Sequence, residues 1–177
     1  MAVELAKVSL WLDSFTIGAP LSFLDHHVRC GNSLIGSTVE EVREKVGSGQ
    51  LLVWNSQFTG LMLATDMMRH VGELSDVTGT QIEESRSEYR RASDALAPFK
   101  RILDVYTSRW FGNTPYKIKE RKETRVVDPT VEFLMSKEAE EWVNDPAKQV
   151  ELFEWGVEKT ATSAAAKERF FHWELEF

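Results

Sequence analysis

The sequence has a single cysteine, no long apolar run and no internal repeat, and each gap excludes a class of protein. Cys30 is the only cysteine among 177 residues, so no internal disulfide can form. The longest apolar runs are short and broken by Asp, Lys or Gly, so none predicts a membrane-spanning helix. The first residues do not combine a basic stretch with an apolar one, as a signal peptide would. We therefore expect a cytoplasmic protein.

Patterns typical of phosphate and metal sites are missing as well. Gly31 and Gly36 are spaced like the glycines of a phosphate-binding loop, but no Lys follows Gly36. Asp25, His26 and His27 are adjacent, and adjacent residues on a strand point to opposite faces, so they do not readily share an ion. The four histidines also lack the spacing of metal ligands. We expect no metal site.

The residues that are present suit one globular domain, or a small domain with an insertion. The net charge of −7 conceals a segregation, because residues 86–127 carry 11 basic and 5 acidic side chains between two acidic stretches. Aromatic residues, among them Tyr89, Trp110 and Tyr116, are interleaved with these charges. Such a region is typical of a solvated helix face and also of DNA contact, so both interpretations stay open. The candidate DNA-binding residues are Arg90, Arg91, Lys119 and Arg121.

The first 36 residues predict an α/β order of elements. Apolar residues at helical spacing predict a helix over 2–16 with one covered face. The residues on that face are Leu5, Val8, Leu12 and Phe15. Residues His27–Cys30 predict a short buried strand in which Cys30 serves as inert packing. Helix, turn and strand in this order are typical of an α/β sheet.

The middle of the chain predicts helices instead. Thr38 followed by Glu41 is a capping box, which predicts a helix start. Pro98 should kink or split the longest helix. The helices expected run over residues 38–46, 57–71, 80–110, 131–143 and 145–168. Residues 112–127 predict a loop with an extended piece at 124–127, and the alternation over 171–177 predicts a strand.

Three strings together resemble the adenine-specific DNA methyltransferases of single-chain restriction-modification and phage-defence enzymes. They are AVELAKVSLWL at 2–12, FLDHHVRCGNSLIG at 23–36 and FFHWELEF at 170–177, and SRWFG at 108–112 is also similar to the family's insertions. The resemblance implies a mainly α fold with an α/β remnant, in which a partial Rossmann-like methyltransferase sheet is interrupted by a large helical insertion. The implied parts are a cofactor-binding segment over 1–36, a helical insertion over 37–169 and a returning sheet strand over 170–177.

The resemblance also implies a role for the turn CGNSL. In the family, an Asp or Asn in this turn approaches the adenine of the cofactor, S-adenosylmethionine. By position that residue is Asn32, so Asn32, Ser33 and Leu34 are the implied cofactor-binding residues. Asn also satisfies backbone groups in turns, so a purely local role stays open. A glycine at position 31 would let the backbone turn without a Cβ clash.

Two departures from the family limit what this chain can do alone. It has no Gly-rich cofactor loop and no Asn-Pro-Pro-aromatic string, and its five prolines are isolated. We therefore expect no catalytic residue here. The resemblance implies a complete enzyme that transfers a methyl group from S-adenosylmethionine to the adenine amino group of double-stranded DNA. The alternative is a non-catalytic helical interaction or DNA-contacting scaffold module. Because an incomplete sheet leaves open edges, we expect the isolated chain to self-associate.

Overall fold

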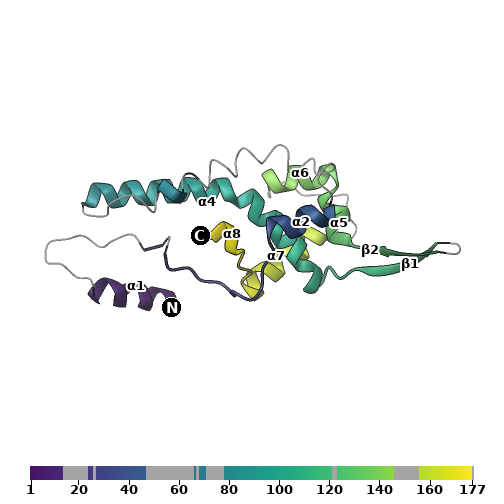
Figure 1. The fold of residues 1–177 in the computed structure, drawn as a ribbon, viewed down its shortest axis with the longest axis horizontal. Coiled ribbons are helices and arrows are strands. Elements are labelled where there is room, and N and C mark those ends of the chain that lie inside the picture. The colour runs from purple at the N-terminus through teal and green to yellow at the C-terminus, as the bar shows by residue number, and fades with distance from the viewer. Residues whose placement is uncertain are drawn as a thin grey trace. The chain divides into compact units, whose positions relative to one another are not determined.

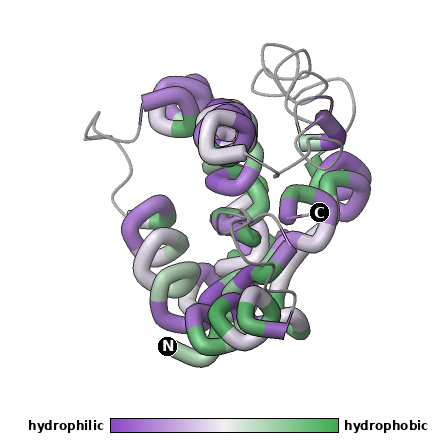
Figure 2. Tube along the Cα trace, turned by 90° about the vertical axis from the view of Figure 1, so that its left-hand side faces the viewer, coloured by the Kyte–Doolittle hydropathy of each residue, from purple (hydrophilic) through white to green (hydrophobic). Residues whose placement is uncertain are grey.

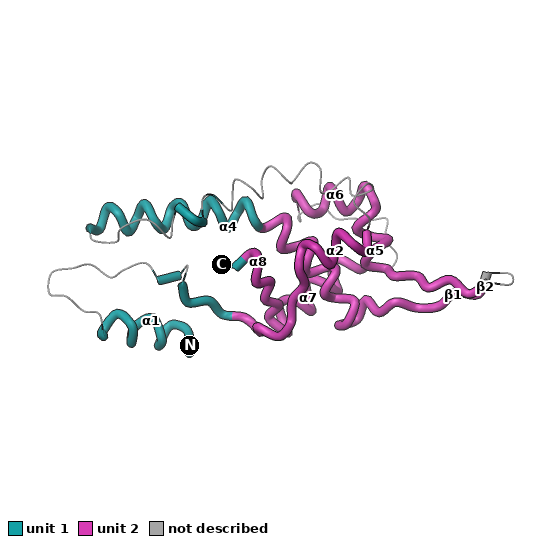
Figure 3. Tube along the Cα trace, viewed as in Figure 1, with its two compact units in different colours: residues 1–30, 59–96, 176–177 teal, residues 31–58, 97–175 magenta. Residues whose placement is uncertain are grey.

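The protein's structure, a computed structural model, describes residues 1–13, 24–25, 27–46, 66, 68–70, 78–120, 123–145 and 156–176. These residues are mainly helical, with one two-stranded antiparallel sheet. The chain divides into two compact units, coloured differently in Figure 3. The first unit comprises Met1–Cys30, Thr59–Leu96 and Glu176–Phe177, and the second comprises Gly31–Phe58 and Ala97–Leu175. None of the described helices combines the length and apolar character that crossing a membrane requires.

Helix α1 (Ala2–Asp13) confirms the predicted amino-terminal helix over the residues described there (Figure 1). The expected burial of its apolar face is wrong: Leu5, Val8 and Leu12 are 60%, 51% and 61% exposed. No residue of α1 is buried. Helical spacing states which side chains share a face, whereas burial depends on what packs against that face. Figure 2 shows the mixture of apolar and polar residues along the helical tubes.

The predicted strand at His27–Cys30 is wrong. The amides of His27 and Val28 both donate to the carbonyl oxygen of Leu24 at 3.0 Å, which folds the chain into a local turn. Cys30 is exposed, so its expected packing role in a buried strand is wrong as well. Arg29 nevertheless contacts the end of the chain within the first unit, through an ion pair of 3.1 Å to Glu176.

Two capping boxes begin helices. In α2 (Val39–Val46), the Thr38 amide donates to Glu41 at 3.0 Å, and the Glu41 amide donates to the Thr38 hydroxyl at 3.2 Å. This confirms the start predicted from the sequence. Helix α4 (Gly79–Thr107) begins in the same way, with Thr78 and Gln81 as the reciprocal pair.

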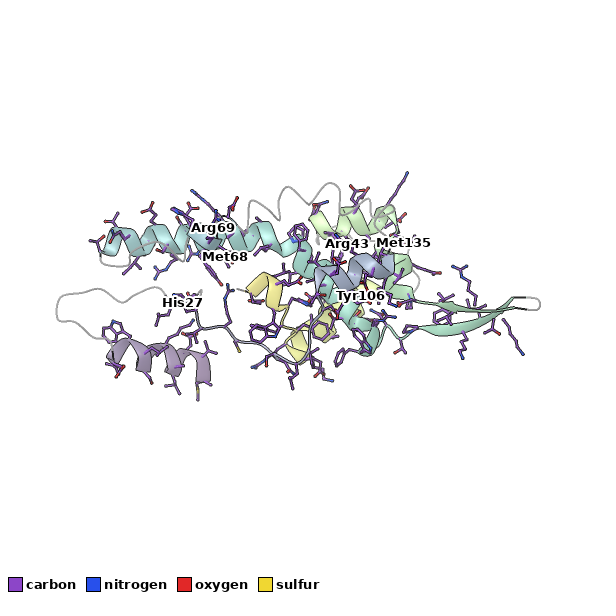
Figure 4. The ribbon with its side chains drawn as sticks, in the orientation of Figure 1. His27, Arg43, Met68, Arg69, Tyr106 and Met135 are labelled. Atoms are coloured by element: carbon purple, nitrogen blue, oxygen red, sulfur yellow. The ribbon has the colours of Figure 1, made fainter. Side chains whose placement is uncertain are left out.

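Helix α4 confirms the longest helix that the sequence predicts. Pro98 lies inside it and does not split it. A 3₁₀ turn, η1 (Ser108–Trp110), continues the chain. The part of α4 in the second unit lies at the centre of that unit's core. Its buried residues include Phe99, Ile102, Leu103, Val105 and Tyr106. Of the helix predicted over 57–71, only Asp66 and Met68–His70 are described, and these four residues are helical; Figure 4 labels Met68 and Arg69.

Strands β1 (Tyr116–Glu120) and β2 (Glu123–Val127) pair antiparallel, from Tyr116 opposite Val127 to Glu120 opposite Glu123. The extended piece predicted at Thr124–Val127 is confirmed. The loop predicted before it is wrong at Tyr116–Glu120. Tyr116 and Ile118 alternate with Lys117 and Lys119, so the period of two is present in the sequence but covers only four residues.

The region predicted as one helix over 131–143 contains two helices, α5 (Pro129–Leu134) and α6 (Lys137–Asn144). The break lies at Ser136, whose hydroxyl accepts from the Ala139 amide at 3.1 Å and caps α6. Helix α7 (Val157–Glu168) confirms the later part of the helix predicted over 145–168; residues 146–155 lie outside the described residues.

The strand predicted over 171–177 is wrong over the described residues 171–176. Trp173–Glu176 form a short helix, α8, in which the Leu175 amide donates to the His172 carbonyl at 2.9 Å. Phe170 alone pairs as in a sheet, in an isolated parallel bridge with Asn32. Burial here does not follow the alternation, because the consecutive residues Phe170, Phe171 and His172 are all buried whereas Trp173 is exposed.

Candidate functional site

The turn that contains Asn32 lies directly against the segment that follows α7. The Asn32 amide donates to the Arg169 carbonyl at 2.7 Å, and the Phe171 amide donates to the Ile35 carbonyl at 2.7 Å. We call Gly31–Ser37 together with Arg169–His172 the junction; both parts belong to the second unit. The junction brings two segments side by side that are more than 130 residues apart in the sequence.

Both glycines of the junction are fixed by the close approach of Phe171. A Cβ at Gly31 would overlap the Phe171 ring, and a Cβ at Gly36 would overlap the Phe171 carbonyl oxygen. The expectation that glycine at position 31 avoids a Cβ clash is confirmed. The group that a Cβ would meet is the Phe171 side chain of the facing segment. Both glycines of this motif let two chain segments pack closely.

The three residues implied in cofactor binding differ in exposure and bonding. The Asn32 side-chain oxygen accepts from the Leu34 amide at 3.3 Å, which is the local turn role that the sequence left open. Its carboxamide nitrogen has no hydrogen-bond partner among the described residues. Leu34 is 93% exposed. The Ser33 carbonyl accepts from the Trp173 indole at 3.1 Å. The turn thus presents an amide donor beside an exposed apolar side chain.

A buried polar cluster links the junction to helix α4. His172 is fully buried, and its Nδ1 accepts from the Ser37 amide at 3.1 Å. The Nε2–H of His172 donates to the Asp104 carboxylate at 2.9 Å, and Nδ1 also lies 3.2 Å from the Ser37 carbonyl oxygen. The Ser37 hydroxyl lies 2.8 Å from the Thr107 hydroxyl. Because that hydroxyl bonds to Thr107 instead of His172, the cluster holds α4 to the junction and is no Ser-His-Asp catalytic arrangement.

The candidate DNA-binding residues do not share one compact unit. Arg90 and Arg91 are exposed on the part of α4 that belongs to the first unit, and Arg91 pairs with Glu88 at 2.6 Å. Lys119 is exposed on β1 in the second unit. Arg121 lies outside the described residues. The positive middle of the sequence is therefore divided between the two units.

The end of strand β2 is anchored by an ion pair that the sequence did not reveal. Arg109 donates to Asp128 at 2.6 Å, and its guanidinium lies 4.9 Å from the ring centroid of Tyr106, which Figure 4 labels. Burial raises the pKa of the Tyr106 phenol above its ordinary value, although the charge of Arg109 opposes this rise. Asp128 also accepts from the Thr130 amide at 3.1 Å and so caps α5.

Sequence reasoning did not identify four residues whose hydrogen bonds and ion pairs hold these segments together: His172, Asp104, Arg109 and Asp128. Asp128 before Pro129 is a recognisable cap, whereas nothing in the sequence pairs His172 with a carboxylate 68 positions away. Among the described ranges, no group of His, Cys, Asp and Glu side chains is placed to hold a metal ion. No protein-family model, curated protein or solved structure matches this chain.

Proposed function

We propose that this chain forms part of the cofactor-binding region of an adenine-specific DNA methyltransferase. The observation that carries the proposal is the parallel bridge between Asn32 and Phe170. It joins the two segments that resemble the family, at the turn implied to approach the cofactor. The helical excursion from Ser37 to Arg169 leaves and returns at this one place, as an insertion into a sheet would. The Rossmann-like sheet belongs to the same proposal and is supported by this single parallel pairing.

The turn is chemically suited to an adenine ring. A base edge offers nitrogen acceptors, and the Asn32 carboxamide nitrogen is a donor that has no partner among the described residues. The neighbouring Leu34 is exposed and apolar, which suits the face of a flat ring. Asn32, with Ser33 and Leu34, would therefore hold the adenosine part of S-adenosylmethionine.

The cofactor supplies the methyl group, and the target adenine must leave the DNA stack because its amino group is inaccessible inside the duplex. The role proposed for this chain is binding and orientation. Positioning of this kind contributes to catalysis without a reactive side chain.

Calorimetry of the complete enzyme with S-adenosylmethionine tests the proposal. We expect Asn32→Ala to weaken binding roughly fivefold, because one hydrogen bond contributes about 1 kcal/mol. Asn144→Ala is the matched control; it makes the same change at an exposed position on α6 and should leave the affinity unchanged. Absence of binding heat in every protein would refute the proposal, as would equal affinities of the two variants. The coding sequence on either side provides a second check, since the Gly-rich loop and the Asn-Pro-Pro-aromatic string should flank this region.

A non-catalytic helical or DNA-contacting scaffold is the second candidate. The observation that favours it is that the described residues are mainly helical and that their one sheet is an exposed hairpin. This candidate predicts that S-adenosylmethionine produces no binding heat. It also predicts that the Asn32→Ala variant binds the macromolecular partner as well as the unaltered protein does.

A further inference from the structure

Strands β1 and β2 form a ribbon that core packing does not explain. The ribbon extends away from the helices of the second unit, to which it belongs (Figure 1, Figure 3). Only its root is covered: Tyr116 is half-buried and Val127 is buried. Beyond the root, the described side chains are exposed on both faces; they are Lys117, Ile118, Lys119, Thr124, Arg125 and Val126. A two-stranded hairpin alone is at best marginally stable in water. The exposed ribbon therefore suggests a role other than stabilising the core.

One face of the ribbon carries unneutralised positive charge. Lys117 lies opposite Val126 and Lys119 opposite Thr124, so the two lysines share a face about 7 Å apart along the strand. Neither lysine forms an ion pair with a described residue. Arg125, on the other face, pairs with Glu132 at 3.3 Å.

Helix α4 differs in this respect, although it also belongs to the basic middle of the sequence. It contains five basic and five acidic residues. Arg86 pairs with Glu83, and Arg91 pairs with Glu88, each at 2.6 Å. The formal charges of α4 therefore cancel, whereas Lys117 and Lys119 on the ribbon form no ion pair with a described residue.

The root of the ribbon is held firmly enough to orient it. Val127 leads directly into Asp128, which caps α5 and pairs with Arg109. Arg109 in turn lies over the rings of Tyr106 and Trp110, at 4.9 and 5.3 Å from their centroids. An interaction element works best when its supporting side chains are fixed by packing and hydrogen bonds.

We propose that the β1–β2 ribbon lies in the major groove of duplex DNA, with Lys117 and Lys119 on the phosphates. The major groove of B-DNA, about 12 Å wide, admits a two-stranded ribbon. Lysines that neutralise phosphates bind without regard to sequence and release counterions. The identity of the partner as duplex DNA rests on the proposed function. The ribbon's chemistry supports this choice over strand addition by a protein, because edge lysines oppose the approach of another strand.

The test measures fluorescence anisotropy of a labelled duplex of arbitrary sequence with the 177-residue chain, between 50 and 200 mM NaCl and without cofactor. We expect Lys117→Ala/Lys119→Ala to lower the slope of log K against log salt concentration by about 2, and affinity at 50 mM by roughly tenfold. Lys159→Ala/Lys167→Ala removes the same charge from exposed positions on α7 and should leave the slope unchanged. Circular dichroism checks that each variant is folded.

Three results would overturn the inference. The first is no DNA binding by the unaltered chain at 50 mM salt. The second is an equal loss in the two lysine pairs, which indicates only a general effect of net charge. The third is unchanged DNA binding with increased aggregation of Lys117→Ala/Lys119→Ala, which indicates that the lysines protect open strand edges. Because the assay contains no S-adenosylmethionine, a failure here and a failure of cofactor binding are told apart.

Discussion

At the scale of single residues, the junction depends on the absence of side chains as much as on their presence. Gly36 faces the backbone carbonyl of Phe171, which cannot move aside as the end of a flexible side chain can. Gly31 faces the ring of the same residue. The buried His172 then bonds to Ser37 and Asp104 at the edge of this contact. A small residue at position 36 and a polar ring at position 172 thus hold together segments far apart in the sequence.

The junction glycine gives the first prediction. Gly36→Ala should lower the free energy of unfolding by about 2 kcal/mol, as an added methyl group does in a tightly packed contact. Urea unfolding followed by circular dichroism measures the change. Gly79→Ala is the matched control, because a Cβ there has no atom within 4 Å, and it should be neutral or slightly stabilising. Equal stability of the two variants would show that the junction is not packed as described.

At the scale of elements, helix starts and the root of the ribbon share one feature, a side chain that caps a helix N-terminus. Asp128 performs two tasks at once, because it caps α5 and neutralises Arg109. An Asn at this position could keep the cap, since its side-chain oxygen accepts a hydrogen bond, but it carries no charge.

This division of tasks can be measured. Asp128→Ala should destabilise the chain by about 2 kcal/mol, since it removes a cap and leaves a half-buried Arg109 unpaired. Asp128→Asn should recover roughly half of that loss. Chemical unfolding of the three proteins under the same conditions provides the comparison. If Asn and Ala cost the same, the cap contributes nothing and the ion pair alone anchors the root.

At the scale of the whole molecule, the chain leaves apolar surface uncovered within its first unit. Leu5 and Leu12 are 60% and 61% exposed on α1, on the face that the sequence pattern expects to be covered. A helix with such a face gains stability when the face is buried against a partner.

We therefore predict that the isolated chain self-associates as its concentration rises. Sedimentation velocity between about 5 and 500 µM should show a rising mean mass, since burial of apolar area favours the associated form. Leu5→Glu/Leu12→Glu should shift association to higher concentration. Ser9→Glu/Asp13→Ala, on exposed polar positions of the same helix, serves as the control for a changed helix surface. A monomer at the highest concentration would contradict the prediction.

The sequence by itself determined the start of α2 and the presence of the long helix α4, whereas the division of the helix predicted over 131–143 into α5 and α6 was not predicted. The capping box at Thr38 and Glu41, and the apolar period of α4, both state local relations, because a helix bonds each residue to one four positions away. The candidate turn at Asn32 was likewise located by its own residues. The segment that the turn contacts could not be located from these residues.

Only the tertiary structure decided whether the predicted strands form. A strand has no hydrogen bonds of its own and depends on a neighbouring segment. His27 and Val28 bond instead to Leu24, Leu175 bonds to His172, and a single parallel bridge at Asn32 and Phe170 remains. In the same way, Tyr116–Glu120 became a strand because Glu123–Val127 lies beside it. Pairing between distant or adjacent segments is a property of their arrangement in space, and the sequence pattern of one segment alone does not fix it.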